Sequence, residues 1–181
     1  VYKLLAGELE ERWKKYTVEE VYFFQRSSSS PANSLYTITG NQIVGSFSKA
    51  GTSGDLNILD TGSSLTAGAN SSTIISNNNF SNITSVGTSR ITGFSYNMGQ
   101  SCIITGNTFS NWTAGGSSGQ GNLAITVTAA TIQDISRNVI SNMTHPFAFI
   151  GINVSGSGTS AVLDSNQIIG ITTVANNTGL S

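Results

Sequence analysis

The chain has 181 residues and a formal net charge of −1, from eight basic and nine acidic side chains. Charged residues make up 9% of the sequence, against roughly 25% in an average globular protein, so no strong field exists to attract nucleic acid or an anionic membrane. The single cysteine, Cys102, excludes an internal disulfide framework and a cysteine-based zinc site. No apolar run is long enough to insert into a membrane.

Residues 1–26 differ in composition from the rest, because they hold ten of the seventeen charges. Leucine and aromatic residues recur at helical spacing over residues 3–16, with charged residues between them, which predicts an amphipathic helix. Residues 17–26 suit either a further helical turn or a strand. Residues 27–32, four serines followed by Pro31 and an alanine, are expected to be a linker.

Residues 33–181 contain five copies of a repeat that align on one asparagine each, at spacings of 37, 29, 31 and 28 residues: Asn41, Asn78, Asn107, Asn138 and Asn166. An aliphatic residue stands three positions before each asparagine, and Ile or Phe stands two positions after it. The fifth position after it is apolar in four copies, with Ser46 as the exception. A further strand-like stretch follows each of the first four motifs. About three short strands in roughly thirty residues suit one turn of a parallel β-helix better than a propeller blade.

In such a coil the apolar columns would fill the interior, at the strand spacing of about 4.8 Å. The asparagine column is expected to take the left-handed backbone conformation of a sharp corner and to bond its amides along the stack. A second column lies four residues later, where asparagine alternates with glycine: Gly45, Asn82, Asn111, Asn142 and Gly170. Such alternation is typical of a corner with positive φ.

The repeat, I-x-x-N-x-[FI]-x-[NG], resembles the right-handed parallel β-helix repeats of pectin-lyase-like proteins, especially the non-enzymatic repeat regions of large secreted bacterial surface proteins. The resemblance covers residues 33–181 and implies an all-β, right-handed parallel β-helix of about five coils. An amphipathic helix often caps such folds, so residues 1–26 are expected to be a cap or a foreign leader. The chain is expected to be an excerpt of a longer solenoid, in contact with neighbouring repeats of its parent chain.

Many pectin-lyase-like proteins cleave acidic polysaccharides, which requires carboxylates for acid–base chemistry and cations to stabilise negative charge. The best constellation that this chain offers is Asp134, Arg137, Asp164 and His145. Strand alternation predicts that both aspartates project outward on neighbouring turns. Scattered solubilising charges and a turn histidine explain these residues more simply, so the sequence predicts no catalytic residue, no cofactor and no metal site.

The expected function is therefore that of a non-catalytic structural or adhesive segment, secreted or at the cell surface, which binds a surface glycan or another surface protein. Four aromatic residues are candidates for stacking on sugars if they are exposed: Phe94, Tyr96, Phe147 and Phe149. The alternative is a fragment of a polysaccharide lyase or hydrolase. A weaker alternative is an ice-binding solenoid, for which the candidate face is one column of threonines: Thr84, Thr113, Thr144 and Thr172.

Overall fold

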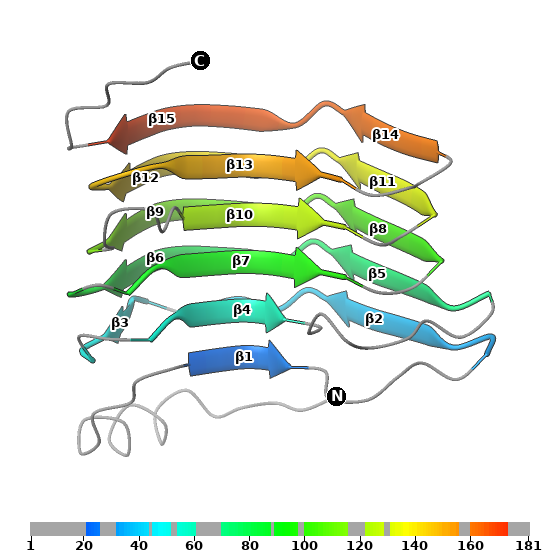
Figure 1. The fold of residues 1–181 in the computed structure, drawn as a ribbon, viewed down its shortest axis with the longest axis horizontal. Coiled ribbons are helices and arrows are strands. Elements are labelled where there is room, and N and C mark those ends of the chain that lie inside the picture. Colours follow the sequence, from blue (N-terminus) through cyan, green and yellow to red (C-terminus); the bar gives the residue numbers. More distant parts are fainter. Residues whose placement is uncertain are drawn as a thin grey trace.

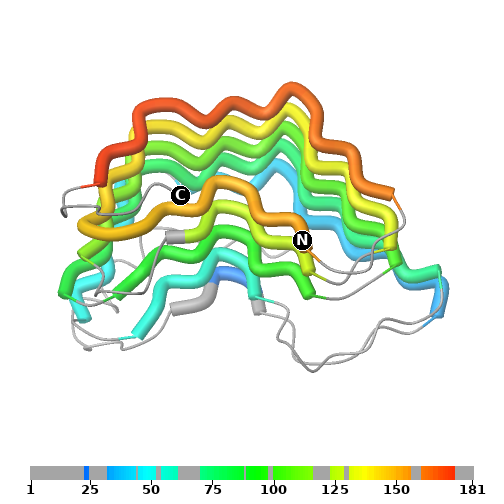
Figure 2. Tube along the Cα trace, turned by 45° about the horizontal axis from the view of Figure 1, so that its top comes forward, coloured from blue at the N-terminus to red at the C-terminus, as the bar shows by residue number. Residues whose placement is uncertain are grey.

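The computed structural model describes residues 21–25, 32–43, 45–51, 54–60, 70–87, 89–97, 100–115, 122–128, 131–155 and 160–173. These residues are all-β, without a helix, and form fifteen strands in three five-stranded sheets. Each sheet takes every third strand, so the backbone visits the three sheets in turn and advances by one strand per turn (Figure 1). The result is a parallel β-solenoid of about four turns (Figure 2).

Sheet A consists of β1 (Val21–Gln25), β4 (Leu56–Asp60), β7 (Ile91–Tyr96), β10 (Asn122–Val127) and β13 (Phe149–Val154). Sheet B consists of β2 (Leu35–Thr39), β5 (Ser72–Ser76), β8 (Ser101–Thr105), β11 (Ile132–Ser136) and β14 (Ser160–Asp164). Sheet C consists of β3 (Phe47–Lys49), β6 (Asn79–Ser85), β9 (Thr108–Ala114), β12 (Val139–His145) and β15 (Gln167–Thr173). Neighbouring strands pair in parallel in every sheet.

The apolar columns of the repeat line the interior of the solenoid. In sheet B, Ile75 pairs with Ile104 and Ile104 with Ile135, and all three side chains are fully buried. In sheet C, Phe109 lies between Phe80 and Ile140 in the same way. Strand alternation sends every second side chain inward, so a residue type repeated once per turn becomes a continuous column in the core.

Aromatic rings fill the middle of the core and join the sheets to one another. The ring of Phe109 contacts Phe94 of sheet A at a centroid distance of 4.9 Å and Trp112 of sheet C at 5.5 Å. Trp112 is fully buried, and its Nε1–H donates to the backbone oxygen of Phe80 at 2.7 Å. The indole therefore fills the core without leaving a donor unpaired.

The exception in the apolar column, Ser46, has a structural cause. Gln42 forms a bridge with Asn79, yet Phe47 pairs with Ile83, so the first turn has one more residue than the second between these positions. The extra residue is a local bulge, which shifts every later residue of that turn by one position. Phe47 therefore takes the apolar position that alignment on the asparagines assigned to Ser46.

The N-terminal region differs from the expectation in one respect. Residues 21–25 form β1, which pairs with β4, so sheet A begins within the segment expected to be a cap or leader and upstream of residue 33. The physical reason is that this stretch is apolar and aromatic, and Phe23 and Phe24 pack against the core. The helix expected over residues 3–16 and nearly all of the 27–32 linker lie outside the described residues.

Candidate functional site

The element that recurs in every repeat is an asparagine at the corner between sheets B and C, and together these residues form a ladder: Asn41, Asn78, Asn107, Asn138 and Asn166. Each Nδ2 donates to Oδ1 of the next asparagine along the axis, at 2.8–3.0 Å. The same Oδ1 accepts the preceding asparagine's backbone N–H at 2.9–3.1 Å.

The second N–H of the amide links the ladder to the backbone of the preceding turn. Asn107 donates to the Ile75 oxygen at 2.9 Å, and Asn138 donates to the Ile104 oxygen at the same distance. Both asparagines are fully buried. Since each amide offers two N–H donors and one oxygen acceptor, every polar group of these side chains is paired.

The left-handed backbone position lies one residue before the ladder, which corrects the expectation that the asparagines themselves adopt it. Positive φ occurs at the residue that precedes each ladder asparagine: Gly40, Asn77, Gly106, Arg137 and Ser165. The corner turns on this residue, and the asparagine after it points inward.

A second line of amides runs along the outside of sheet C. Asn142 donates to Asn111 Oδ1 at 3.1 Å, and Asn111 donates to Asn82 Oδ1 at 2.9 Å. All three residues have φ between 54° and 60° and are exposed. Gly45 and Gly170 hold the corresponding positions in the first and last turns, with φ of 85° and 65°. The expectation of positive φ in this column is confirmed.

Hydroxyl groups form further lines on the outer faces. In sheet B, Thr105 and Ser136 share a hydrogen bond of 3.1 Å, while in sheet C Ser110 donates to Ser81 at 2.7 Å. The threonine column of sheet C is in register from turn to turn and consists of Thr84, Thr113, Thr144 and Thr172. The outer surface of sheet C thus carries amides and hydroxyls repeated once per turn.

The two aspartates of the catalytic candidate set lie on neighbouring strands. Asp164 pairs in register with Ser136, two positions beyond Asp134, which places the two Cα atoms about 8 Å apart by strand geometry. Both alternate with the inward Ile135 column and so lie on the outer side of sheet B. Asp134 is half-buried and its Oδ1 has no hydrogen-bond partner. Among the described residues Arg137 bonds to Thr105, at 3.2 Å, and to neither carboxylate side chain.

His145, the fourth candidate, lies apart from the other three. It ends β12, and its side chain is fully buried inside sheet C. Nδ1 accepts the backbone N–H of Phe147 at 3.0 Å, while Nε2 has no hydrogen-bond partner. Burial lowers the pKa of His145 below its ordinary value. The structure therefore does not place this imidazole beside the aspartates.

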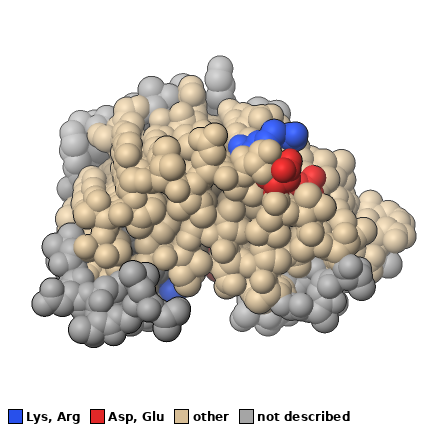
Figure 3. All heavy atoms as spheres, turned by 90° about the horizontal axis from the view of Figure 1, so that it is seen from above, with Lys and Arg blue, Asp and Glu red and all other residues tan. Residues whose placement is uncertain are grey.

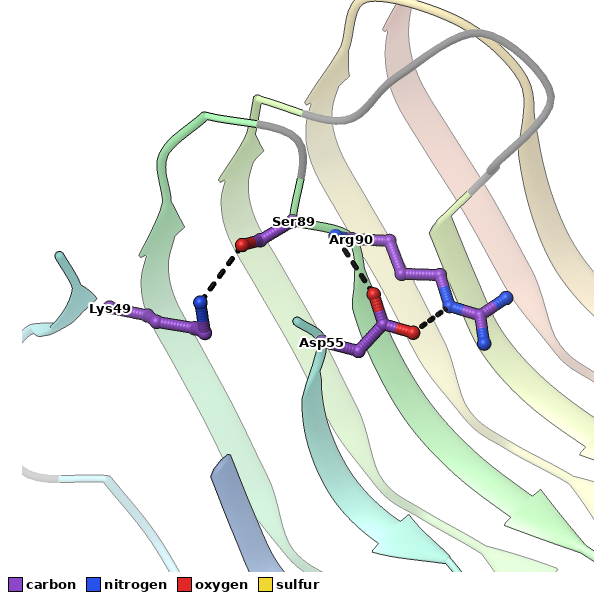
Figure 4. Close-up of polar contacts among 4 residues, drawn as sticks. All are labelled: Lys49, Asp55, Ser89 and Arg90. Carbon is purple, nitrogen blue, oxygen red and sulfur yellow. Dashed lines mark hydrogen bonds and ion pairs between the residues drawn. The ribbon is translucent and has the colours of Figure 1, made fainter. Parts of the chain in front are cut away.

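The sequence did not predict a cluster of four polar residues at the corner between sheets C and A (Figure 4). Lys49 is buried, and its Nζ donates to the Gly51 oxygen at 3.0 Å and to Ser89 Oγ at 2.9 Å. Beside it, Arg90 Nε donates to Asp55 at 2.5 Å. A neighbouring lysine can activate a serine hydroxyl as a nucleophile. Ser89 is fully buried, however, so its hydroxyl is not accessible to a substrate. No repeat signal marks Lys49, because the next turn has Ser85 at the paired position.

The candidate sugar-stacking residues are buried or only half-exposed. Phe94 and Tyr96 are buried, whereas Phe147 and Phe149 are half-buried. The described residues contain no group of three or more histidine, cysteine, aspartate or glutamate side chains that would hold a metal ion. Across the same part of the chain, no helix is long and apolar enough to cross a bilayer.

Comparison with known proteins adds no family to this picture. Neither a family model, nor a curated protein sequence, nor a solved structure matches the chain.

Proposed function

We propose that the chain is a non-catalytic structural or adhesive segment of a secreted cell-surface protein, built as a right-handed β-helix of the pectin-lyase-like type. Right-handed crossovers account for about 98% of connections between parallel strands of one sheet, which supports this handedness. The observation that carries the proposal is the continuous asparagine ladder, which joins each turn to the next through buried amide hydrogen bonds. Such a core makes a stiff scaffold whose outer residues are free to vary.

The adhesive surface is assigned to the outer face of sheet C. Its amide line, Asn82, Asn111 and Asn142, is exposed, and amides can both donate and accept the hydrogen bonds that sugar hydroxyls form. Recognition rests on amides and hydroxyls rather than on aromatic stacking, because Phe94 and Tyr96 are buried. The partner is a surface glycan or a glycosylated surface protein.

Glycan binding tests this assignment. The triple variant Asn82→Gly, Asn111→Gly and Asn142→Gly removes the amides, while glycine retains the positive φ of these positions. Binding to an array of bacterial and plant glycans is expected for the wild type and should fall at least about tenfold in the variant, the equivalent of about 1.4 kcal/mol. Asn77→Gly is the matched control, since Asn77 is exposed with φ of 55° but lies at the other corner.

A glycan-cleaving enzyme fragment remains the second candidate, favoured by Asp134 and Asp164 on neighbouring strands and by the unpaired Oδ1 of Asp134. Acid–base cleavage of a glycan requires two such carboxyl groups. The chain is expected to show no turnover of pectin, alginate or other acidic polysaccharides, with or without calcium. Turnover that Asp134→Asn abolishes would replace the scaffold proposal with this one.

The ice-binding alternative rests on the in-register threonine column of sheet C. Strand pairing sets its repeat at about 4.8 Å. Thermal hysteresis that disappears in Thr113→Leu would support this role, whereas freezing behaviour equal to that of a control protein would end it.

A further inference from the structure

The exposed amide line of sheet C has unused hydrogen-bonding capacity. Within the line, Asn142 donates to Asn111 Oδ1 at 3.1 Å, and Asn111 donates to Asn82 Oδ1 at 2.9 Å. A side-chain amide carries two N–H donors and an oxygen with two lone pairs. Asn111 therefore uses one N–H and one lone pair inside the line, and no described residue uses the other two. Such an amide can donate one hydrogen bond to a ligand and accept another from it.

The unused groups repeat with one orientation and one period. All three asparagines have φ between 54° and 60°, and the donor lies in the later turn of each pair. Because their strands pair in register, equivalent atoms recur along the solenoid axis at the strand spacing of about 4.8 Å. A sugar ring with its linking oxygen has a similar length. A linear polysaccharide that lies along the axis would therefore present about one sugar to each turn.

The strands that carry the amide line offer no cation to an acidic ligand. β6, β9 and β12 contain no lysine or arginine, and their one histidine, His145, is buried. Seen from the β14–β15 end, nearly all visible charged side chains of the described residues lie in one small group, in which basic and acidic residues are neighbours (Figure 3). A carboxylate on every sugar would find no partner along the line, so this surface suits an uncharged polymer.

Two glycines limit the length of the line. Gly45 and Gly170 occupy the corresponding positions in the turns before Asn82 and after Asn142, and neither supplies an amide. The line therefore covers three turns, which corresponds to three consecutive sugars of a bound polymer.

We propose that the amide line binds a linear, uncharged polysaccharide along the solenoid axis, with one sugar on each of its three turns. This inference rests on the proposed glycan-binding function and narrows its ligand to one class. On each turn the amide donates to one hydroxyl of a sugar and accepts from another. The neighbouring threonine column, in which Thr113 is exposed, adds one hydroxyl group per turn. Recognition is thus distributed along the polymer and needs no free chain end.

The dependence of affinity on oligosaccharide length tests the proposal. Neutral cello-, manno- and laminari-oligosaccharides, from a single sugar upward, are titrated into the full chain and followed by NMR. In at least one series, each added sugar up to the third should tighten binding roughly two- to tenfold, as one net hydrogen bond allows, and further sugars should add little. Oligogalacturonates of equal length, with a carboxylate on every sugar, should bind no more tightly than this series.

Shortening the line should shorten the preferred ligand. Asn142→Gly leaves two adjacent amides and retains the positive φ, so the gain in affinity should stop at two sugars. Asn77→Gly is the matched control: Asn77 is exposed with φ of 55° but lies at the other corner, and its variant should keep the wild-type length dependence. Circular dichroism of both variants verifies that the fold is intact.

The outcomes separate this inference from the function on which it rests. A wild-type chain that binds glycans on an array, but binds a single sugar as tightly as the longer oligosaccharides, would overturn the inference and leave the glycan-binding function in place. Tighter binding of oligogalacturonates, or equal length dependence in the two variants, would also overturn it. A wild-type chain that binds no glycan on the array would reject both.

Discussion

Asn107 carries more hydrogen bonds than an ordinary side-chain amide because its neighbours above and below are the same residue. Its oxygen accepts two N–H groups of Asn78, and its nitrogen donates to Ile75 and Asn138. A buried polar group is stabilising only while it is fully paired. A change of side chain at Asn107 should therefore lower the free energy of unfolding more than a change in the exposed amide line.

Replacing the Asn107 amide with a carboxylate tests this dependence. Asn107→Asp keeps both acceptor contacts but loses both donors and sets a buried charge against two oxygens, so it should lower the free energy of unfolding by about 3 kcal/mol at pH 7. Because burial disfavours the charged form, the pKa of this carboxyl group in the folded chain lies above its unfolded value of about 4, so the deficit should shrink as the pH falls toward about 4 and change little below it. Asn111→Asp is the exposed control and should cost well under about 1 kcal/mol. Urea denaturation followed by circular dichroism measures both, and equal losses would contradict the role of burial.

His145 predicts a loss of stability in mild acid. Burial lowers the folded-state pKa of His145 below its ordinary value of 6.5. In mild acid the unfolded chain therefore binds a proton that the folded chain does not, so the protein loses stability as the pH falls below 6.5. The free energy of unfolding should therefore be lower at about pH 5.5 than at about pH 6.5. His145→Asn retains an acceptor for the Phe147 N–H but does not titrate. Urea titrations at both pH values should show the fall in the wild type only, and a variant with the same pH dependence would exclude His145 as its source.

At the scale of the strands, the sequence repeat predicted the interior columns well, because the same turn of the solenoid sets both the spacing of the repeat and which residues are buried. A side chain that recurs once per turn meets its own kind in the next turn, so Ile104, Phe109 and Trp112 could be placed in the core from spacing alone. The insertion before Phe47 could not be found by alignment on the asparagines, since a bulge leaves both neighbouring motifs intact.

Two parts of the candidate site escaped prediction for a different reason. The left-handed corner position has no common residue type, since Arg137 and Ser165 occupy it beside two glycines and one asparagine. The burial of His145 could not be predicted for the same reason, since its column has no common residue type. Thr173 pairs with His145 in the next turn, and the first two turns have Lys49 and Ser85 in this column. Where the residue type differs from turn to turn, the position of each side chain is set by the register of the neighbouring columns. Such a column produces no recognisable repeat in the sequence.

The Phe109 column allows the packing argument to be tested at two depths. Phe109→Ala should cost about 3–5 kcal/mol through lost burial and an internal cavity. Ile168→Ala alters the same column in the last turn, where the side chain is 47% exposed, and should cost about 1 kcal/mol or less. Thermal and urea unfolding measure both variants. Similar costs at the two positions would mean that the column is not a continuous interior.

At the scale of the whole molecule, a solenoid is held together turn by turn, because each coil pairs only with the coils before and after it. The middle turns are enclosed on both sides, whereas the last turn exposes its interior columns. Stability is therefore expected to fall from the middle toward the β13–β15 end. Local unfolding of single turns can be compared by placing the same chemical probe at equivalent positions of different turns.

The interior column of sheet B that contains Cys102 supplies such reporters: Tyr36, Thr73, Cys102, Gln133 and Ala161. Cys102 is fully buried, and burial raises the pKa of its thiol, so a thiol reagent should label it only when the middle turn opens. Its labelling should follow the same urea transition as the circular dichroism signal. Ala161→Cys in a Cys102→Ala background moves the thiol to the last turn, where residue 161 is exposed, and this thiol should be labelled without urea. Labelling of Cys102 well before global unfolding would mean that single turns open independently, and the ladder would then not couple them.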